Sequence, residues 1–370
     1  MPAVITGSAV LTCFGDGRST FSALLGGATG VRKLRGADAG KLSVTSGYHI
    51  GDRPDDERFL ASRWLTTCLR NALRQSGIDP ASRRVAVVVG TGLRELGAVE
   101  AGLPVAAERL HFGSAVRAAV PEAAEILTIS NACSAGGHAL AIAQDLVESG
   151  DADAAIAAGT DAMTISMLAM IGRVTDTPTE QVRPFDADRT GVLLGEGAAA
   201  VVVEPEPAKA RSLARLLSTG LSCDAGHETA PDRAGIRRAI VDALDRARLA
   251  PADVDLVIAH GTGTALNDPV EAELIGEVLA ADGPGPLITA VKGAVGHTSG
   301  GSALLSVDVA MRCMAAGVVP PIAGLRCLLD EGSGLRFVMG SPEHATIRVA
   351  QINAFGFGGV NSITMLGAPR

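Results

Sequence analysis

Two short segments of this chain recur, in the same order, in its second half, and this repetition limits the fold more than any other feature. The segment 87–92, Val-Val-Val-Gly-Thr-Gly, resembles 257–263, Val-Ile-Ala-His-Gly-Thr-Gly. The segment 136–140, Gly-Gly-His-Ala-Leu, resembles 300–304, Gly-Gly-Ser-Ala-Leu. In a chain with 45 glycines, chance is the alternative explanation for matches this short. We interpret them as a duplication, in which each half repeats one supersecondary unit.

The hydrophobic pattern predicts alternating strands and helices, an α/β fold, on both sides of a seam. A length of 370 residues with 47% hydrophobic content favours two domains or one large duplicated unit. Pro205–Pro207 marks the seam, which predicts halves 1–206 and 207–370. A polar, irregular stretch covers residues 28–58. The predicted strands cover 3–12, 85–89, 154–158, 213–222, 254–259 and 287–291, and the predicted helices cover 60–76, 137–149, 232–248 and 301–316.

One repeated segment carries a cysteine between a predicted strand and a predicted helix. Cys133 follows the apolar run 126–129 and precedes the helix that we expect from Gly137. Unpaired N–H groups at a helix N-terminus favour the thiolate, which is the nucleophilic form. Cys133 stands three residues before one glycine pair, and His297 stands three residues before the other. If an approximate two-fold axis relates the halves, these two turns face each other. The alternative for Cys133 is a small buried cysteine.

Composition argues against several classes of protein. A net charge of −8 and only 3% aromatic residues give no support to nucleic-acid binding. No apolar run reaches the ~18 residues of a membrane span, and the N-terminus does not read as a signal peptide. The six cysteines form no CxxC pair, which argues against a disulfide framework or a metal site and favours a reducing cytoplasm.

Five motifs together resemble the β-ketoacyl synthases of the thiolase superfamily, in particular the elongating branch with a Cys-His-His site. Each motif alone is weak, but the five occur in the family's order over nearly the whole chain. They are Asn-Ala-Cys-Ser-Ala-Gly-Gly at 131–137, Arg-Pro-Phe-Asp to Gly-Glu-Gly-Ala at 183–198, His-Gly-Thr-Gly-Thr to Asp-Pro-x-Glu-Ala at 260–272, Lys-Gly-x-x-Gly-His-Thr at 292–298 and Asn-Ala-Phe-Gly-Phe-Gly-Gly-x-Asn at 353–361.

The resemblance implies a thiolase fold, a duplicated αβαβα arrangement of five layers, and decarboxylative Claisen condensation. By this resemblance Cys133 holds the acyl group as a thioester. His260 and His297 donate hydrogen bonds to the enolate that forms when CO2 leaves. The backbone N–H groups of Cys133 and Phe357 form the oxyanion hole. Lys292 and Glu196 match a lysine and an acidic position near the histidines, and we expect an ion pair that orders His297.

The resemblance also implies the substrate contacts and the partners. Thr262 and Thr264 would bind the phosphopantetheine arm of an acyl-carrier protein, which serves as a substrate handle, and no separate cofactor is expected. Phe357 would be the aromatic gate of the acyl pocket. We expect a homodimer, or a heterodimer with a ketosynthase-like subunit, in fatty acid or type II polyketide synthesis. The segment from Gly92 to Cys133 is shorter than is typical of the family, which leaves the pocket depth open.

Alternative functions on the same fold stay open at this point. One is an acyltransferase that moves the acyl group from Cys133 to an alcohol or amine without condensation. Another is a non-catalytic chain-length partner subunit of a ketosynthase heterodimer, which the presence of Cys133 disfavours. A thiolase needs a second late cysteine, but the last one, Cys327, lies outside the glycine-rich motif. A priming synthase has asparagine where His297 stands.

Overall fold

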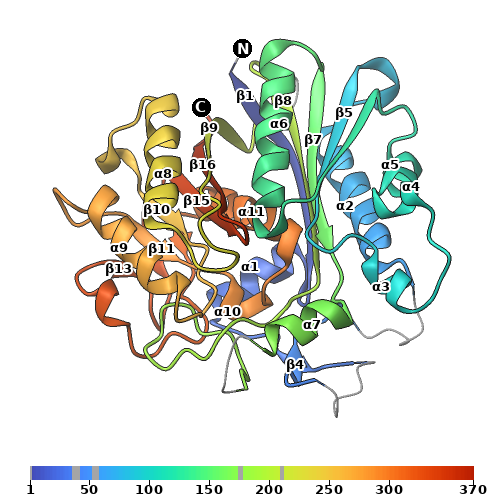
Figure 1. Cartoon of the computed structure of the whole chain (residues 1–370). Helices are drawn as coiled ribbons and strands as arrows, with labels where there is room; N and C mark the ends of the chain where they lie inside the picture. The colour runs from blue at the N-terminus through green and yellow to red at the C-terminus, as the bar shows by residue number, and fades with distance from the viewer. Residues whose placement is uncertain (1, 36–41, 52–57, 174–177, 209–211) are drawn as a thin grey trace.

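The computed structural model describes residues 2–35, 42–51, 58–173, 178–208 and 212–370. In this described part the main sheet has 12 strands, and it contains two runs of five with the same order (Figure 1). Part of the predicted polar stretch 28–58, namely 36–41 and 52–57, lies outside the described residues. The first run is β6 (Glu125–Ile129), β5 (Val85–Gly90), β7 (Ala154–Asp161), β8 (Gly197–Pro205) and β1 (Ala3–Thr12), and the second is β11 (Leu287–Thr289), β10 (Leu256–Ile258), β15 (Val349–Gly356), β16 (Val360–Gly367) and β9 (Ala214–Cys223).

The two runs also share their strand directions. In each run the first three strands are mutually parallel and the last two pair antiparallel. The runs join where β1 pairs antiparallel with β9 through Ala3↔Leu216, Val4↔Arg215 and Ile5↔Ala214. An approximate two-fold axis between β1 and β9 therefore relates the halves, and the predicted duplicated fold is confirmed.

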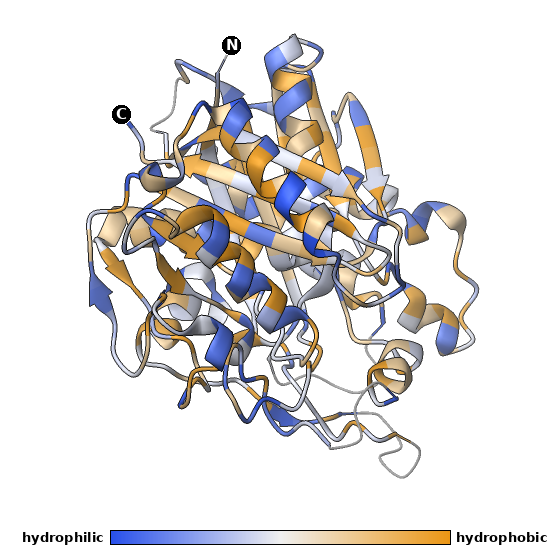
Figure 2. Ribbon diagram, turned by 60° about the vertical axis from the view of Figure 1, so that its left-hand side comes forward, coloured by the Kyte–Doolittle hydropathy of each residue, from blue (hydrophilic) through white to orange (hydrophobic). Residues whose placement is uncertain are grey.

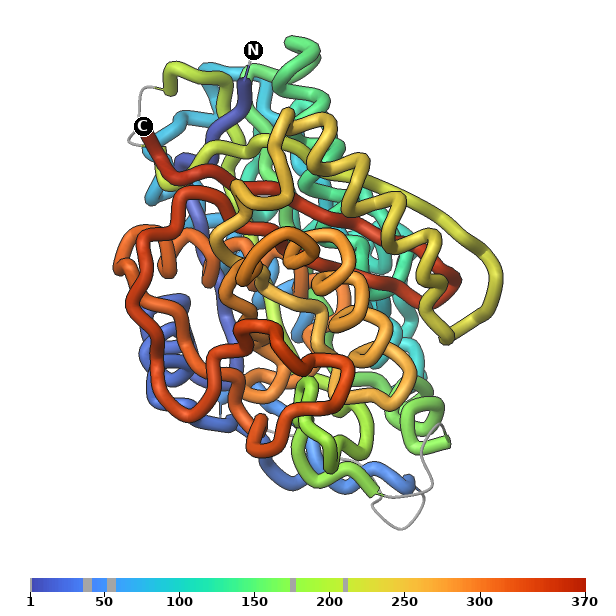
Figure 3. Tube along the Cα trace, turned by 90° about the vertical axis from the view of Figure 1, so that its left-hand side faces the viewer, coloured from blue at the N-terminus to red at the C-terminus, as the bar shows by residue number. Residues whose placement is uncertain are grey.

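Helices cover both faces of each run and give five layers. On β5, Val85, Val87 and Val89 pack with the outer helix α2 (Leu60–Ser76), whereas Ala86 and Val88 face the centre of the molecule. The central layer holds α6 (Ala135–Ser149) and α11 (Ser302–Ala316) (Figure 1). The helices α8 (Arg233–Ala247) and α9 (Asn267–Leu279) pack on the outer face of the second run, and Figure 3 shows α8 beside the C-terminal strands. The strands are mostly apolar along their length (Figure 2), as expected for sheets covered on both faces.

The remaining elements are short: β2 (Gly15–Asp16) and β13 (Arg336–Phe337) belong to the main sheet, and the others lie in the connections. None of the described helices is long and apolar enough to cross a membrane. The short helices are α1 (Gly17–Leu25), α3 (Leu96–Glu100), α4 (Ala107–Leu110), α5 (Gly113–Ala119), α7 (Ile165–Ile171) and α10 (Lys292–Val295), the 3-10 turns are η1 (Pro80–Ser82), η2 (Ala132–Ser134), η3 (Pro251–Asp253), η4 (Ser299–Gly301) and η5 (Asp330–Gly332), and the short strands are β2 (Gly15–Asp16), β3 (Arg32–Lys33), β4 (Ser46–Gly47), β12 (Val318–Val319), β13 (Arg336–Phe337) and β14 (Glu343–His344).

The structure corrects the predicted equivalence of Cys133 and His297. The central helices α6 and α11 each follow a 3-10 turn, η2 and η4, and these turns carry matching left-handed residues, Ala132 (φ 59°) and Ser299 (φ 47°). By this alignment the counterpart of Cys133 is Gly300, and His297 lies three residues earlier. The prediction was wrong because the glycine pairs occupy different positions: Gly136 is inside α6, whereas Gly300 is inside η4.

Candidate active site

The candidate residues lie in segments that follow the carboxyl ends of the parallel strands in each half. In the first half, Cys133 follows β6. In the second half, His260 follows β10, Lys292 follows β11 and Phe357 follows β15. Ligand sites of α/β sheets lie at such strand ends. The residues of both halves that line a cavity of about 100 Å³ here are Gly92, Ala132, Cys133, Met167, Ile171, Val192, Leu194, His260, Thr262, Thr264, His297, Ser299, Phe355 and Phe357.

Cys133 lies in the sharp turn between β6 and α6, where the left-handed Ala132 redirects the chain. Burial raises the pKa of the Cys133 thiol to about 11. The Lys292 ammonium and the backbone N–H groups of Phe357 and Cys133 act in the opposite direction and lower this pKa. The expectation of a thiolate favoured by the helix terminus is therefore corrected, because desolvation outweighs these groups and the resting side chain is a thiol.

His260 is fixed by hydrogen bonds that define its tautomer. Its Nδ1 accepts from the Lys292 ammonium at 3.3 Å and from the Phe355 N–H at 3.4 Å. Because both partners are donors, Nε2 carries the ring proton. The Phe355 ring packs on the imidazole with centroids 5.3 Å apart. His260 therefore presents one N–H group, on a rigid support.

His297 lies edge-on to His260, with ring centroids 5.5 Å apart and an interplanar angle of 89°. Its backbone is held by residues 193–195, since its N–H donates to Leu193 O and its carbonyl accepts from Gly195 N, both at 2.9 Å. Neither ring nitrogen has a hydrogen-bond partner within the described ranges of the chain. Burial, together with the Lys292 charge, holds the pKa of both histidines well below the usual value, so both rings are neutral at pH 7.

The predicted Lys292–Glu196 ion pair does not form. The Lys292 ammonium donates to the His260 carbonyl oxygen, and the carboxylates that raise its pKa are Glu271 and Asp268. Desolvation outweighs them and lowers the pKa of Lys292 to about 8. The Glu196 carboxylate instead accepts the N–H of Ile50 at 3.0 Å.

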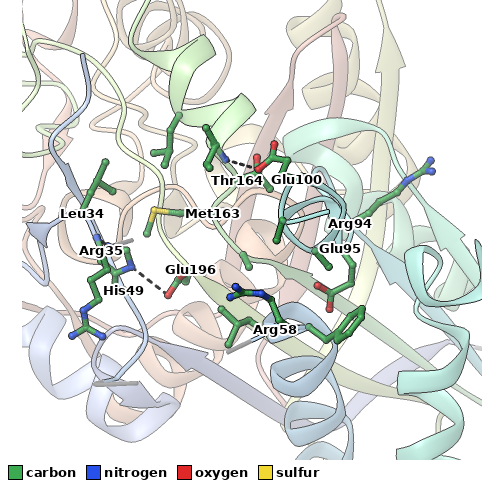
Figure 4. Close-up of a pocket in the computed structure, with 18 residues that line it drawn as sticks. Leu34, Arg35, His49, Arg58, Arg94, Glu95, Glu100, Met163, Thr164 and Glu196 are labelled. Carbon is green, nitrogen blue, oxygen red and sulfur yellow. Dashed lines mark hydrogen bonds and ion pairs between the residues drawn. The ribbon is translucent and has the colours of Figure 1, made fainter. Parts of the chain in front are cut away.

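Glu196 faces a different cavity, of about 260 Å³. There its Oε2 lies 3.6 Å from Nδ1 of His49, as Figure 4 shows. Among the described residues, this cavity and the one that contains Cys133 have no lining residue in common. The resemblance thus placed the acidic partner of Lys292 in the wrong segment.

The predicted binding residues lie at the cavity. The hydroxyls of Thr262 and Thr264 are 2.9 Å apart, and both residues line it. Phe357 lies in the turn after β15 and is 40% exposed. An exposed phenyl ring beside a buried thiol fits a position at the cavity mouth.

Two buried carboxylates that sequence reasoning left without a role support the histidine segment. Glu271 accepts the N–H groups of His260 at 2.7 Å and Gly261 at 2.8 Å. Asp268 accepts those of Thr262 at 3.1 Å and Gly263 at 3.0 Å. Their signal was present, since the Asp-Pro-x-Glu spacing puts both on one face of the first turn of α9. The described residues contain no group of three or more His, Cys, Asp or Glu that could hold a metal ion.

The fold and the site together define a thiolase-fold acyltransferase, with one cysteine and two imidazoles in a single cavity. Models of the N-terminal and C-terminal domains of beta-ketoacyl synthase match residues 59–208 and 213–326. The chain belongs to the β-ketoacyl synthase family.

Relatives and solved structures agree with this assignment. The 3-oxoacyl-[acyl-carrier-protein] synthase 2 of Mycobacterium tuberculosis is 32% identical, over 97% of this chain and 95% of that protein. Nodulation protein E of Rhizobium meliloti is 32% identical, over 94% of this chain and 92% of that protein. The solved ishigamide ketosynthase/chain length factor is 29% identical, with a TM-score of 0.89, and the match covers 100% of this chain and 99% of that one.

Proposed function

We propose that this chain condenses a Cys133-bound acyl group with a malonyl-type thioester on an acyl-carrier protein, by decarboxylative Claisen chemistry. The observation that carries the proposal is the shared cavity, in which one thiol lies with two neutral imidazoles. A thiol alone suffices for acyl transfer. Hydrogen-bond donors for an enolate are needed only if a carbanion forms.

In the first half-reaction, the Cys133 sulfur attacks the carbonyl of an acyl thioester. The new bond joins sulfur and acyl carbon, and the carrier leaves as a thiol that takes the cysteine proton. The backbone N–H groups of Cys133 and Phe357, which act on the sulfur, would hold the oxyanion of the tetrahedral intermediate. Losing one such donor costs on the order of 10²–10³ in rate.

In the second half-reaction, the malonyl carboxylate leaves as CO2 and its electron pair forms an enolate. The Nε2–H of His260 and one N–H of His297 would donate to the enolate oxygen. His297 suits this role because its ring nitrogens have no hydrogen-bond partner in the described part of the chain. The enolate carbon then attacks the acyl carbonyl, the C–S bond breaks, and the Cys133 thiolate takes up one proton.

The substrate handle would be the phosphopantetheine arm of the carrier, with Thr262 and Thr264 as its binding residues. Their position in the lining of the cavity supports this role. The relative from M. tuberculosis carries the acyl-carrier protein in its name, and the ishigamide structure is a ketosynthase/chain length factor. By this likeness we propose a dimer, either of two copies or with a ketosynthase-like partner.

The decisive experiment separates loading from condensation. Cys133→Ala should abolish acylation by acyl-carrier protein, and His297→Ala should load at Cys133 but release no CO2 from malonyl-carrier. Intact-protein mass spectrometry measures loading, and release of labelled CO2 measures decarboxylation. Acylation that persists at another residue in Cys133→Ala would overturn the nucleophile assignment. Full transfer to an alcohol or amine without CO2 release in the wild type would favour the acyltransferase alternative.

A further inference from the structure

Asp161, the last residue of β7, is a buried carboxylate that the proposed mechanism does not use. Its side chain is 1% exposed. Its Oδ1 accepts the Thr91 hydroxyl at 2.6 Å and the Leu93 N–H at 2.8 Å. Its Oδ2 accepts the N–H groups of Gly92 at 2.8 Å and Gly300 at 2.7 Å. Burial raises the pKa of Asp161, and each of the four donors lowers it and offsets part of the cost of burying the carboxylate.

These donors come from both halves of the chain. Thr91, Gly92 and Leu93 follow β5 in the first half, whereas Gly300 belongs to η4 in the second half. The backbones touch here, because a Cβ on Gly300 would lie 2.4 Å from the Cα of Thr91. Asp161 therefore links the two halves where no side chain fits between them.

Both linked segments border the catalytic cavity. Gly92 lines it from the first half, and Ser299, which precedes Gly300, lines it from the second. Gly300 follows His297 by three residues. The four hydrogen bonds of Asp161, called the Asp161 bridge below, therefore hold the turn that follows His297.

The charge of Asp161 also reaches the catalytic sulfur. Asp161 raises the pKa of Cys133, whereas Lys292 lowers it. The other titratable groups at the cavity are the neutral rings of His260 and His297. Removal of the Asp161 charge should therefore lower the pKa of Cys133, because the effect of Lys292 on the thiol is then no longer opposed by this carboxylate.

We propose that Asp161 is a positioning residue: its carboxylate holds the turn after His297 against the turn after β5, and so fixes His297 relative to Cys133. The catalytic consequence rests on the function proposed above. Loading uses groups on η2 and the turn after β15, which Asp161 does not contact. Decarboxylation uses His297 as well, so loss of the bridge should slow the second step more than the first.

Asp161→Asn is the test, because an amide offers one acceptor oxygen in place of two and removes the charge. We expect CO2 release to fall about 10- to 100-fold, as for a small misplacement of a catalytic group. Loading should not fall by more than about threefold, since a lower Cys133 pKa supplies more thiolate, and this marks a loss specific to the second step. The midpoint of the pH dependence of Cys133 alkylation by iodoacetamide should move to lower pH.

Glu204→Gln is the matched control. Glu204 is also 1% exposed, and it accepts the Thr6 hydroxyl at 2.6 Å. It lies near the end of β8 that is farther from Asp161, because Asp161 pairs with Gly197 at the other end of this strand. This variant should lower the melting temperature without changing the ratio of the two steps or the alkylation midpoint. If both steps fall equally in Asp161→Asn, or if its midpoint does not move, the proposal is wrong.

Thr91→Val provides a second route if Asp161→Asn does not fold. It removes one donor to Asp161 and keeps the charge of the carboxylate. CO2 release should therefore fall severalfold, while the loading rate and the midpoint of Cys133 alkylation stay as in the wild type. Equal loss in both steps, or loss in neither, would overturn the proposal.

Failure of the proposed function would look different: the wild type would release no CO2, while the alkylation shift in Asp161→Asn would still report on the bridge.

Discussion

At the scale of single residues, the Lys292 ammonium opposes burial of the thiol. It is the first of the groups that lower the pKa of Cys133. Lys292→Met should therefore raise this pKa above about 11. A rise of one unit makes the thiolate about tenfold scarcer at a given pH. The rate of Cys133 alkylation should fall by that factor at pH 7, where Lys292, with a pKa of about 8, is mostly protonated in the wild type. Quenched-flow mass spectrometry measures this rate.

Lys33→Met is the control for this prediction, since Lys33 lies exposed on β3. The rate of Cys133 alkylation in Lys33→Met should match that of the wild type. An unchanged rate in Lys292→Met would show that the lysine does not act on the sulfur.

Sequence reasoning found the residues that stand in glycine-rich turns, and it failed at their partners. Cys133 and His260 could be selected because each follows a strand and precedes glycine-rich backbone, and His297, which follows α10, because it stands between Gly296 and the pair Gly300–Gly301. The carboxylates whose charge acts on Lys292 could not be selected, because they are whichever ones the fold brings near the buried cation. Those are Glu271 and Asp268. Only three-dimensional proximity distinguishes them from Glu196.

At the scale of elements, α7 forms one wall of the cavity that contains Cys133. Met167 and Ile171 on this helix line it, and Thr164 caps the helix by accepting the Met167 N–H at 3.3 Å. A cavity of about 100 Å³ is small for an acyl site, since ligand pockets commonly have roughly 300–1,000 Å³. The length of the Met167 side chain is therefore expected to limit the acyl chain.

Met167→Ala should let longer chains load. We expect the loading rate of an eight-carbon acyl group, relative to a four-carbon group, to rise about tenfold, the usual effect of one or two methylenes in a pocket. Mass spectrometry of Cys133 occupancy measures this ratio. Met170→Ala is the control, because Met170 is on the same helix and 36% exposed. The same ratio in both variants would exclude α7 as the limiting wall.

Element positions were largely predictable, with errors where packing overrides local signals. The helix at 232–248 begins as predicted, because Asp232 caps it through the Gly235 N–H. The helix expected from Gly137 begins earlier, at Ala135. Position 136 lies inside this helix and needs glycine there, because a Cβ would lie 2.5 Å from Gly300 O. Glycine signals a helix end in isolation, but here it signals close contact between the halves.

At the scale of the whole molecule, the two halves share the central apolar core, the pairing of β1 with β9 and the cavity that contains Cys133. The β1–β9 ladder has three residue pairs. The cavity brings together the thiol of one half and the imidazoles of the other. This arrangement buries His260 and His297, so the assembly of the site has a cost in stability that depends on pH.

The pH dependence of this cost can be predicted. The folded-state pKa of both histidines lies well below the unfolded value of 6.5. Below pH 6.5 the unfolded chain therefore binds protons that the folded chain does not, and stability is lost as the pH falls. Two such groups together should lower the free energy of unfolding by about 2.5 kcal/mol between pH 7 and pH 5.5.

Buried carboxylates complicate the absolute curve, because burial raises the pKa of Asp161, Asp268 and Glu271 and gives the opposite slope at acid pH. The contribution of the two histidines is therefore the difference between the wild type and a variant that lacks both. Relative to His260→Gln/His297→Gln, the wild type should lose about 2.5 kcal/mol over this interval, measured by urea unfolding. The exposed His344→Gln should follow the wild type at each pH. Parallel curves for the wild type and the double variant would show that the two imidazoles titrate alike in the folded and unfolded chains, and the neutral-donor chemistry proposed for them would then fail.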